Sequence, residues 1–148
     1  MIQSIPIEKI LFLDIETVPQ AEVWKELPEI EQKLWDKKTR FQRKEDVGAE
    51  DFYKERAGIM AEFGKIVCIS IGMLEKNNTL RIKSFANDDE KKILEDFGEI
   101  FNSPKLQNVI LCAHNGKEFD FPYIARRMLI NGFQPPAPFR MFGKKPWE

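Results

Sequence analysis

Two carboxylates stand side by side where an apolar run ends near the start of the chain. The run "ILFL" (10–13) is followed by Asp14 and Glu16, with a single residue between the two acids. Side chains two residues apart on a strand point to the same face of a sheet. Like charges on one face repel each other, and an apolar neighbourhood penalises both of them further. A divalent cation relieves both costs, so this pair is a candidate Mg²⁺ site.

A third carboxylate, Asp120, occurs where a second apolar strand, expected within 108–116, gives way to a helix. If this strand lies beside the first, Asp120 comes close to Asp14 at the carboxyl ends of the strands, where open α/β sheets bind ligands. Three carboxylates from two strands can hold two hard cations about 3.5–4 Å apart. We therefore expect two Mg²⁺ or Mn²⁺ ions, with Asp14, Glu16 and Asp120 as metal ligands and catalytic residues.

The composition is that of one globular domain. The chain has 148 residues, 43% of them hydrophobic, with a net charge of −1. This charge excludes a strongly basic nucleic-acid-coating protein, although a local basic groove stays possible. Cys68 and Cys112 lie in apolar, strand-like runs, which predicts core packing in a reducing compartment. Because the sequence has no run of about 18 apolar residues and no signal-peptide pattern, we expect a cytoplasmic protein without membrane association.

The order of the periodic segments predicts an α/β fold in which helices flank a mixed sheet. Strands are expected at 65–74 and 79–86, joined as a hairpin by the turn residues "EKNN", and the second of them reads as an edge strand. Apolar residues at helical spacing predict helices within 87–101 and 119–132, on either side of the strand in 108–116. We expect a single domain over 1–148.

The segment 20–62 is expected to be a helical insertion in this domain, either a cap over the sheet edge or a mobile flap. Its apolar residues have the spacing of a helical stripe: Trp24, Leu27, Ile30, Leu34 and Trp35. Within the insertion, "KKTRFQRK" (37–44) places five basic residues around Phe41. This mixture suits a phosphate backbone with a stacked base. It equally suits a solvated helix face with one packing ring.

Two motifs resemble those of a known family. Asp14-Ile15-Glu16-Thr17 after an apolar strand is similar to the first motif of the DEDD-type 3′-5′ exonucleases, which have a ribonuclease H-like fold. The stretch 115–124, "NGKEFDFPYI", resembles their second motif as found in the proofreading domains of family-B DNA polymerases. The resemblance is strongest to the bacterial group of predicted exonucleases related to that proofreading domain.

The resemblance implies a role for each matching residue. Asp14 would bridge both metal ions, Glu16 would bind the ion on the nucleophile side, and Asp120 would hold the leaving-group side. Asn115 would contact the sugar-phosphate near the 3′ end, and Phe119 would hold or pack near the terminal nucleotide. The residues expected to bind nucleic acid are Thr17, Asn115, Gly116, Phe119 and Tyr123. The alternatives are a plain turn for Asn115-Gly116, a core aromatic for Phe119 and a strand-end hydroxyl for Thr17.

The family's third motif, a Tyr or His followed four residues later by Asp, has no counterpart in the chain. The fourth carboxylate is therefore missing, and we expect the C-terminal remainder of the domain downstream and impaired activity in this chain. His114, the single histidine, is expected to position its loop rather than act as a base. Arg126 and Arg127 are expected on a solvated or ion-paired helix face, the alternative being contact with phosphates.

These features predict a 3′-5′ exonuclease that hydrolyses terminal phosphodiesters of single-stranded DNA at its 3′ ends, with RNA not excluded. One alternative is a catalytically idle ribonuclease H-like module that binds nucleic acid or a protein partner. The other is a phosphatase of the haloacid dehalogenase type, because the stretch "LFLDIETV" in this chain loosely resembles the opening motif of those enzymes. Glu16, in place of a second Asp, argues against the phosphatase.

Overall fold

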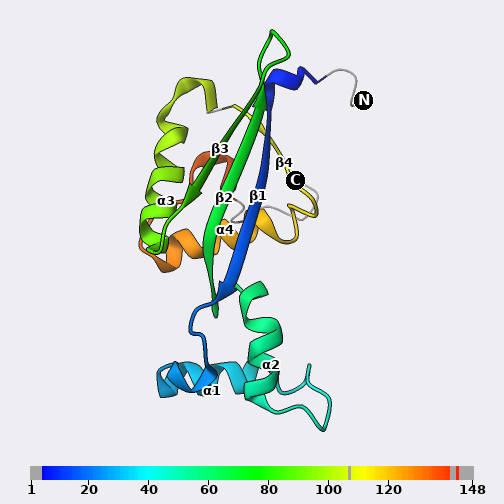
Figure 1. Ribbon diagram of the computed structural model, residues 1–148, viewed down its shortest axis with the longest axis vertical. Helices are drawn as coiled ribbons and strands as arrows, with labels where there is room; N and C mark the ends of the chain where they lie inside the picture. The colour runs from blue at the N-terminus through cyan, green and yellow to red at the C-terminus, as the bar shows by residue number, and fades with distance from the viewer. Residues whose placement is uncertain (1–4, 107, 141–142, 144–148) are drawn as a thin grey trace. The chain divides into compact units, whose positions relative to one another are not determined.

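The computed structural model describes residues 5–106, 108–140 and 143. The strands and α-helices are β1 (Ile10–Pro19), α1 (Glu29–Thr39), α2 (Ala49–Arg56), β2 (Gly64–Leu74), β3 (Leu80–Ala86), α3 (Glu90–Glu99), β4 (Ile110–Cys112) and α4 (Asp120–Ile130) (Figure 1). The chain divides into two compact units. Unit 1 holds the described residues up to Glu16 and from Ile66 onward, and unit 2 is Thr17–Lys65.

A four-stranded mixed sheet in the order β3-β2-β1-β4 is the centre of unit 1. β2 and β3 pair antiparallel, with Ile69 opposite Phe85, and β1 and β4 pair parallel, with Leu11 opposite Leu111. This arrangement confirms the predicted mixed α/β sheet and is consistent with a ribonuclease H-like fold. The hairpin is confirmed as well, and β3 is an edge strand as expected.

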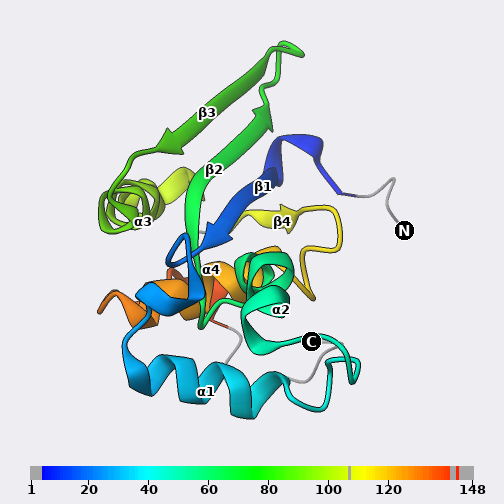
Figure 2. The same ribbon diagram turned by 60° about the horizontal axis from the view of Figure 1, so that its bottom comes forward.

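Helices α3 and α4 cover one face of this sheet, as the views in Figures 1 and 2 agree. Along β1 the buried side chains are Leu11, Leu13 and Ile15, and the exposed ones between them are Phe12, Asp14 and Glu16. Phe85 of β3 points to the helical side, where its ring packs edge-on against Phe97 of α3 at 5.8 Å. The two acidic residues of β1, Asp14 and Glu16, therefore lie on the other, open face of the sheet.

Local sequence signals mark the start of α3 and both ends of α4. Asp89 caps α3, since its carboxylate accepts a hydrogen bond of 2.9 Å from the backbone N–H of Lys91. Pro122 stands in the first turn of α4, where its missing N–H costs no hydrogen bond. Gly132, with φ of +84°, follows the end of α4 in the conformation that glycine adopts most readily.

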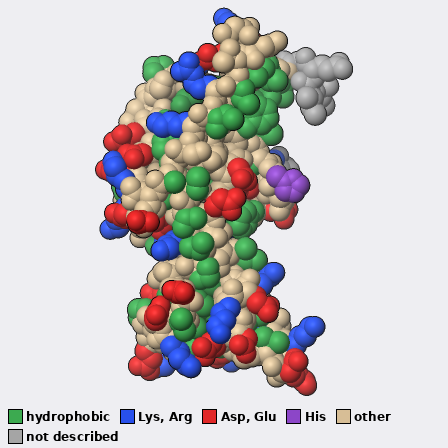
Figure 3. Space-filling model, in the orientation of Figure 1, with side chains coloured by type: hydrophobic (Ala, Val, Ile, Leu, Met, Phe, Trp, Pro, Cys, Tyr) green, Lys and Arg blue, Asp and Glu red, His purple; other side chains and the backbone are tan. Residues whose placement is uncertain are grey.

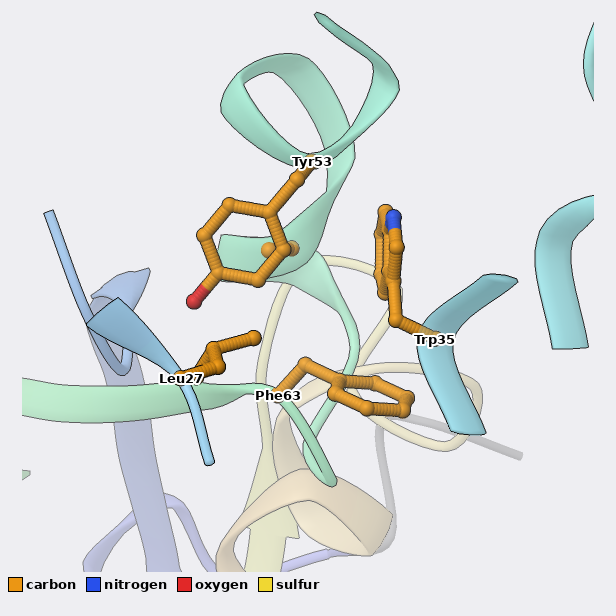
Figure 4. Close-up of a cluster of buried hydrophobic side chains, with 5 residues drawn as sticks. Leu27, Trp35, Tyr53 and Phe63 are labelled. Carbon is orange, nitrogen blue, oxygen red and sulfur yellow. The ribbon is translucent and has the colours of Figure 1, made fainter. Parts of the chain in front are cut away.

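Unit 2 has a hydrophobic core of its own, built around Trp35 of α1 (Figure 4). The Trp35 ring packs edge-on against Tyr53 at 5.1 Å and against Phe63 at 5.0 Å. Its indole N–H donates to the carbonyl of Ala49 at 2.8 Å, so the buried ring leaves no unpaired donor there. Leu27 and Ala57 complete this cluster.

The predicted apolar stripe in this unit was wrong for two of its five members. Ile30 is 68% exposed and Leu34 is 52% exposed. The reason is that α1 begins only at Glu29, so Trp24 and Leu27 reach the core from the segment before the helix rather than from the same helical face. Within α1 the buried face belongs to Trp35, and the opposite face presents Ile30 and Leu34 to solvent.

The prediction of core packing for both cysteines was also wrong. Cys112 is exposed and Cys68 is half-buried, and neither forms a disulfide. Cys112 belongs to β4, whose outer edge no described strand covers, and an apolar run therefore does not guarantee burial there. Among the described residues, no helix has both the length and the apolar character needed to span a bilayer.

Candidate functional site

The carboxyl half of β1 presents its two acids on the open face of the sheet. Asp14 and Glu16 are exposed, and the residue between them, Ile15, is buried beneath the sheet at 7% exposure. Acidic side chains are visible over β1 among hydrophobic ones in Figure 3. Thr17 is the next residue of β1 and is half-buried. The same-face placement of Asp14 and Glu16 follows directly from the two-residue period of the strand.

A tight turn after β4 carries the chain to the third acid. Asn115 adopts a left-handed conformation with φ of +55°, and its carbonyl accepts hydrogen bonds of 3.0 Å from the backbone N–H groups of Glu118 and Phe119. Gly116 is buried, and a Cβ there would come within 2.6 Å of the Phe121 ring. The positive φ at 115 suits asparagine or glycine, and the lack of space for a Cβ at 116 requires glycine there. This turn brings Asp120 to the first position of α4.

Asp120 is a buried carboxyl group, only 3% exposed. Burial raises the pKa of Asp120 above its ordinary value, and the negative charge of Asp14 raises it further. Backbone hydrogen bonds at Asp120 itself and at Ile15, together with the charge of His114, act on this pKa in the opposite direction. Asp14 and Asp120 thus lie close enough to influence each other electrostatically, although they are 106 positions apart.

This raised pKa predicts that Asp120→Asn stabilises the fold at neutral pH. A carboxyl whose pKa is higher in the folded than in the unfolded chain lowers the free energy of unfolding as pH rises through the folded-state value. Thermal melts in EDTA should therefore give a higher Tm for the variant at about pH 7, and equal Tm values at strongly acidic pH, where both states are protonated. Asp46→Asn, at an exposed acid, is the control; an unchanged or lower Tm for Asp120→Asn at neutral pH contradicts this assignment.

The remaining predicted site residues lie around the same turn. The Phe119 ring is half-buried and contacts the ring of Tyr123, with 5.3 Å between centroids. Tyr123 is only 2% exposed, so its side chain supports Phe119 from inside the unit. The exposed side chains of His114 and Asn115 flank this aromatic pair in sequence. Phe119 therefore combines the two alternatives considered for it, a packed ring and an accessible edge.

The donor chemistry at this site suits a hard divalent cation. Carboxylate oxygens are the ligands that Mg²⁺ prefers, and one or two of them with substrate phosphates are sufficient. Asp14 and Asp120 are the candidates for such a pair, because the charge of Asp14 acts on the Asp120 carboxyl, and Glu16 shares the open face with Asp14. Within the part of the chain that the structure describes, no three His, Cys, Asp or Glu residues are gathered closely enough to hold a metal ion by themselves.

Arg127 is ion-paired, as one of the expected alternatives has it, but its ion pair is buried rather than on a helix surface. Arg127 is 4% exposed and Glu90 is 9% exposed. The Arg127 guanidinium donates to both carboxylate oxygens, with Nε at 2.9 Å from Oε1. The same carboxylate accepts from the backbone N–H of Ile66 at 2.7 Å and from the side chain of Asn131 at 3.0 Å. Arg127 is thus committed to the interior and unavailable to phosphates, whereas Arg126 is exposed.

Sequence reasoning assigned Glu90 no role beyond the start of a helix. An acid in the first turn of a helix is ordinarily a solvated partner of the helix dipole. No local signal distinguishes it, because its three partners are contributed by β2, α4 and the residue that follows α4. Glu90, the first residue of α3, therefore links this helix to the sheet and to α4. These contacts lie on the helix-covered side of the sheet, opposite the open face.

Comparisons with known proteins point to nucleic-acid hydrolysis. Residues 59–148, more than half of the chain, match a family described as "predicted 3′-5′ exonuclease related to the exonuclease domain of PolB". Among solved structures, the family B DNA polymerase of the hyperthermophilic archaeon Pyrobaculum calidifontis is similar, with 13% identity and a TM-score of 0.45. That match covers 84% of this chain and 11% of the polymerase chain. No curated protein matches the chain.

Proposed function

Because the chain belongs to the family of predicted 3′-5′ exonucleases related to the exonuclease domain of PolB, we propose that it removes nucleotides from the 3′ end of single-stranded DNA. The observation that carries this proposal is the effect of the Asp14 charge, on β1, on the buried carboxyl of Asp120, which begins the helix after the neighbouring strand β4. The family match begins at residue 59, so the assignment of Asp14 and Glu16 depends on this geometry and on the "DIET" motif.

The proposed roles divide between charge and position. Asp14 and Asp120 would bind the cations, with Glu16 as the third ligand. Mg²⁺ or Mn²⁺, when bound, would lower the pKa of a water and stabilise the leaving 3′ oxygen. The buried Asp120 is held by α4 and by the turn before it, so its carboxylate needs little reorganisation during the reaction. The chain supplies no covalent nucleophile in this mechanism.

The substrate would be positioned by the turn between β4 and α4. The exposed Asn115 side chain would donate to the sugar-phosphate near the 3′ end, and the half-buried Phe119 would offer its ring to the terminal nucleotide. Gly116 acts by its lack of a side chain, because the Phe121 ring fills the space that a Cβ would need. Tyr123 holds Phe119 from below, and Thr17 is a candidate contact at the strand end.

The direct test uses single strands labelled at either end. With Mn²⁺ present, the chain should shorten a 5′-labelled strand slowly, in line with the impaired activity expected for it, and should release the label of a 3′-labelled strand in the first cleavage as a mononucleotide. Release of label from the 5′ end first, or release of inorganic phosphate from small phosphate esters without strand shortening, contradicts the proposal. Binding of the strand without any cleavage would favour the idle module. Parallel DNA and RNA strands establish the sugar preference.

Asn115→Gly separates the turn from the proposed contact. Glycine adopts a positive φ freely, so the variant keeps the turn and loses only the amide. The free energy of unfolding should change by less than about 1 kcal/mol, whereas kcat/KM should fall roughly 10- to 100-fold, the equivalent of one hydrogen bond to a charged group. Asn78→Gly is the matched control, because Asn78 has a φ of +59° in the turn before β3. Equal kinetics for the two variants would mean that Asn115 serves the turn alone.

A further inference from the structure

A cationic surface with one aromatic ring at its centre follows helix α1 in unit 2. We define this basic patch as Lys37, Arg40, Phe41 and Lys44. The Phe41 side chain is 85% exposed, and the Arg40 guanidinium lies 4.6 Å from the centroid of its ring. The cation covers part of the ring and leaves the rest of it to solvent. The segment connecting α1 to α2, which contains Phe41, is visible in Figure 2.

The three cations of this patch form no ion pair with any residue that the structure describes. Two neighbouring cations are paired, Lys38 with Glu62 at 3.1 Å and Arg43 with Asp36. Lys37, Arg40 and Lys44 are exposed and have no ion-pair partner among the residues that the structure describes. Their positive charge therefore faces solvent on the segment that carries Phe41.

Folding of unit 2 does not account for Phe41. The core of the unit is complete without it, because Trp35 and Tyr53 are fully buried and Phe63 packs against Trp35. Ile30 and Leu34 are also exposed, yet α1 places them beside acids as well as bases: Lys33 is paired with Glu29. Phe41 differs from them in being the most exposed of the large hydrophobic residues on the described surface and in having a guanidinium against its ring.

We propose that the basic patch binds single-stranded nucleic acid. A base stacks on the open face of the Phe41 ring, and adjacent phosphates lie against Lys37, Arg40 and Lys44. Stacking requires an unpaired base, since a base within a duplex has both faces covered, so the patch selects single strands over duplexes. This is a holding site without hydrolytic chemistry, and it requires none of the three carboxylates proposed for the reaction.

The test measures binding of short labelled oligo-dT and oligo-rU by fluorescence anisotropy, with the full chain in EDTA to prevent cleavage. Phe41→Ala should weaken binding roughly 5- to 100-fold, as the loss of one stacked base implies. Phe41→Leu should weaken binding as much, because leucine keeps an apolar side chain but has no aromatic face. Phe41→Trp should retain binding. Ile30→Ala, at an exposed apolar residue of α1, is the matched control and should bind like the wild type.

The phosphate contacts are tested by salt. For Lys37→Gln/Lys44→Gln, the slope of log K against log salt concentration should be about 1.4 less steep than for the wild type, since each phosphate contact with a single strand contributes about 0.7. Lys33→Gln, at a lysine paired with Glu29, should leave the slope unchanged. The substitutions should weaken the binding of oligo-dT and oligo-rU alike, because both can make the stacking and phosphate contacts. If only one of the two oligonucleotides loses affinity, the patch binds the nucleic acid with that sugar.

Wild-type affinity in Phe41→Ala would overturn this assignment. Wild-type affinity in Phe41→Leu would overturn it as well, since it would indicate an apolar surface suited to a protein partner. Equal binding of duplex and single strand would also overturn it. Asp14→Asn distinguishes the failure of this proposal from the failure of the exonuclease proposal, because it should abolish cleavage and leave oligonucleotide binding in EDTA intact.

Discussion

Asp14→Asn should lower the rate of nucleotide release from a 3′-labelled strand by about 10³-fold or more. The substitution keeps the size of the side chain and removes the charge that opposes Asp120 across β1 and β4. Metal coordination contributes several kcal/mol of transition-state stabilisation, and every 1.36 kcal/mol corresponds to a factor of ten in rate. The loss should appear in kcat as well as in kcat/KM, because Asp14 is proposed to act through a cation at the reacting phosphate and not on the distant parts of the strand.

Two accompanying measurements make this expectation specific. Mn²⁺ should raise the Tm of the wild-type chain and not that of Asp14→Asn, since only a cation that binds the folded state stabilises it. Glu118→Gln is the matched control, because Glu118 is an exposed acid in the same turn as Asn115 and has no proposed role. If Asp14→Asn and Glu118→Gln release nucleotides equally well, the active site is elsewhere.

Arg127→Met should destabilise the chain by about 3–5 kcal/mol, because it leaves the Glu90 carboxylate buried without its cation. The double variant Glu90→Gln/Arg127→Met should lose less. Glutamine at position 90 removes the unpaired negative charge. Its amide oxygen can still accept the hydrogen bond from the backbone N–H of Ile66, so this buried donor stays paired. Urea denaturation monitored by circular dichroism measures both differences.

Arg126→Met is the control for this pair. Arg126 precedes Arg127 in α4 and is exposed, so its loss should change the free energy of unfolding by no more than about 0.5 kcal/mol. A cost below about 1 kcal/mol for Arg127→Met would show that the buried pair does not hold α3 and α4 to the sheet. Equal costs for the single and double variants would show that the stranded charge is not the cause.

The fold of unit 1 was largely predictable because its signals are local. Asp89 before α3, Pro122 in the first turn of α4 and Gly132 after it are recognisable from neighbouring residues alone. Unit 2 was less predictable, since helical spacing was assumed for Trp24 and Leu27, which precede α1. Burial at an edge was also beyond local reasoning, as Cys112 demonstrates, because it depends on which strands are neighbours in the sheet.

The candidate site divides in the same way. The same-face placement of Asp14 and Glu16 follows from strand geometry and was predictable. The approach of Asp120 to Asp14 required the assumption that β1 and β4 are neighbours, which the structure bears out. The burial of Asp120 and the partnership of Glu90 with Arg127 were not predictable, because each depends on side chains from elements far apart in the sequence.

The unequal edges of the sheet have a consequence for how the protein behaves in concentrated solution. β3 carries Arg81 and Lys83, whose charges oppose the approach of another strand. β4 has only Ile110, Leu111 and Cys112, no charge among them, and Ile110 is 44% exposed. Among the described residues no strand pairs with the outer edge of β4, and unpaired N–H and C=O groups on such an edge are a template for aggregation. Clustering of chains at high concentration should therefore begin at β4, and a lysine in place of Ile110 should delay it.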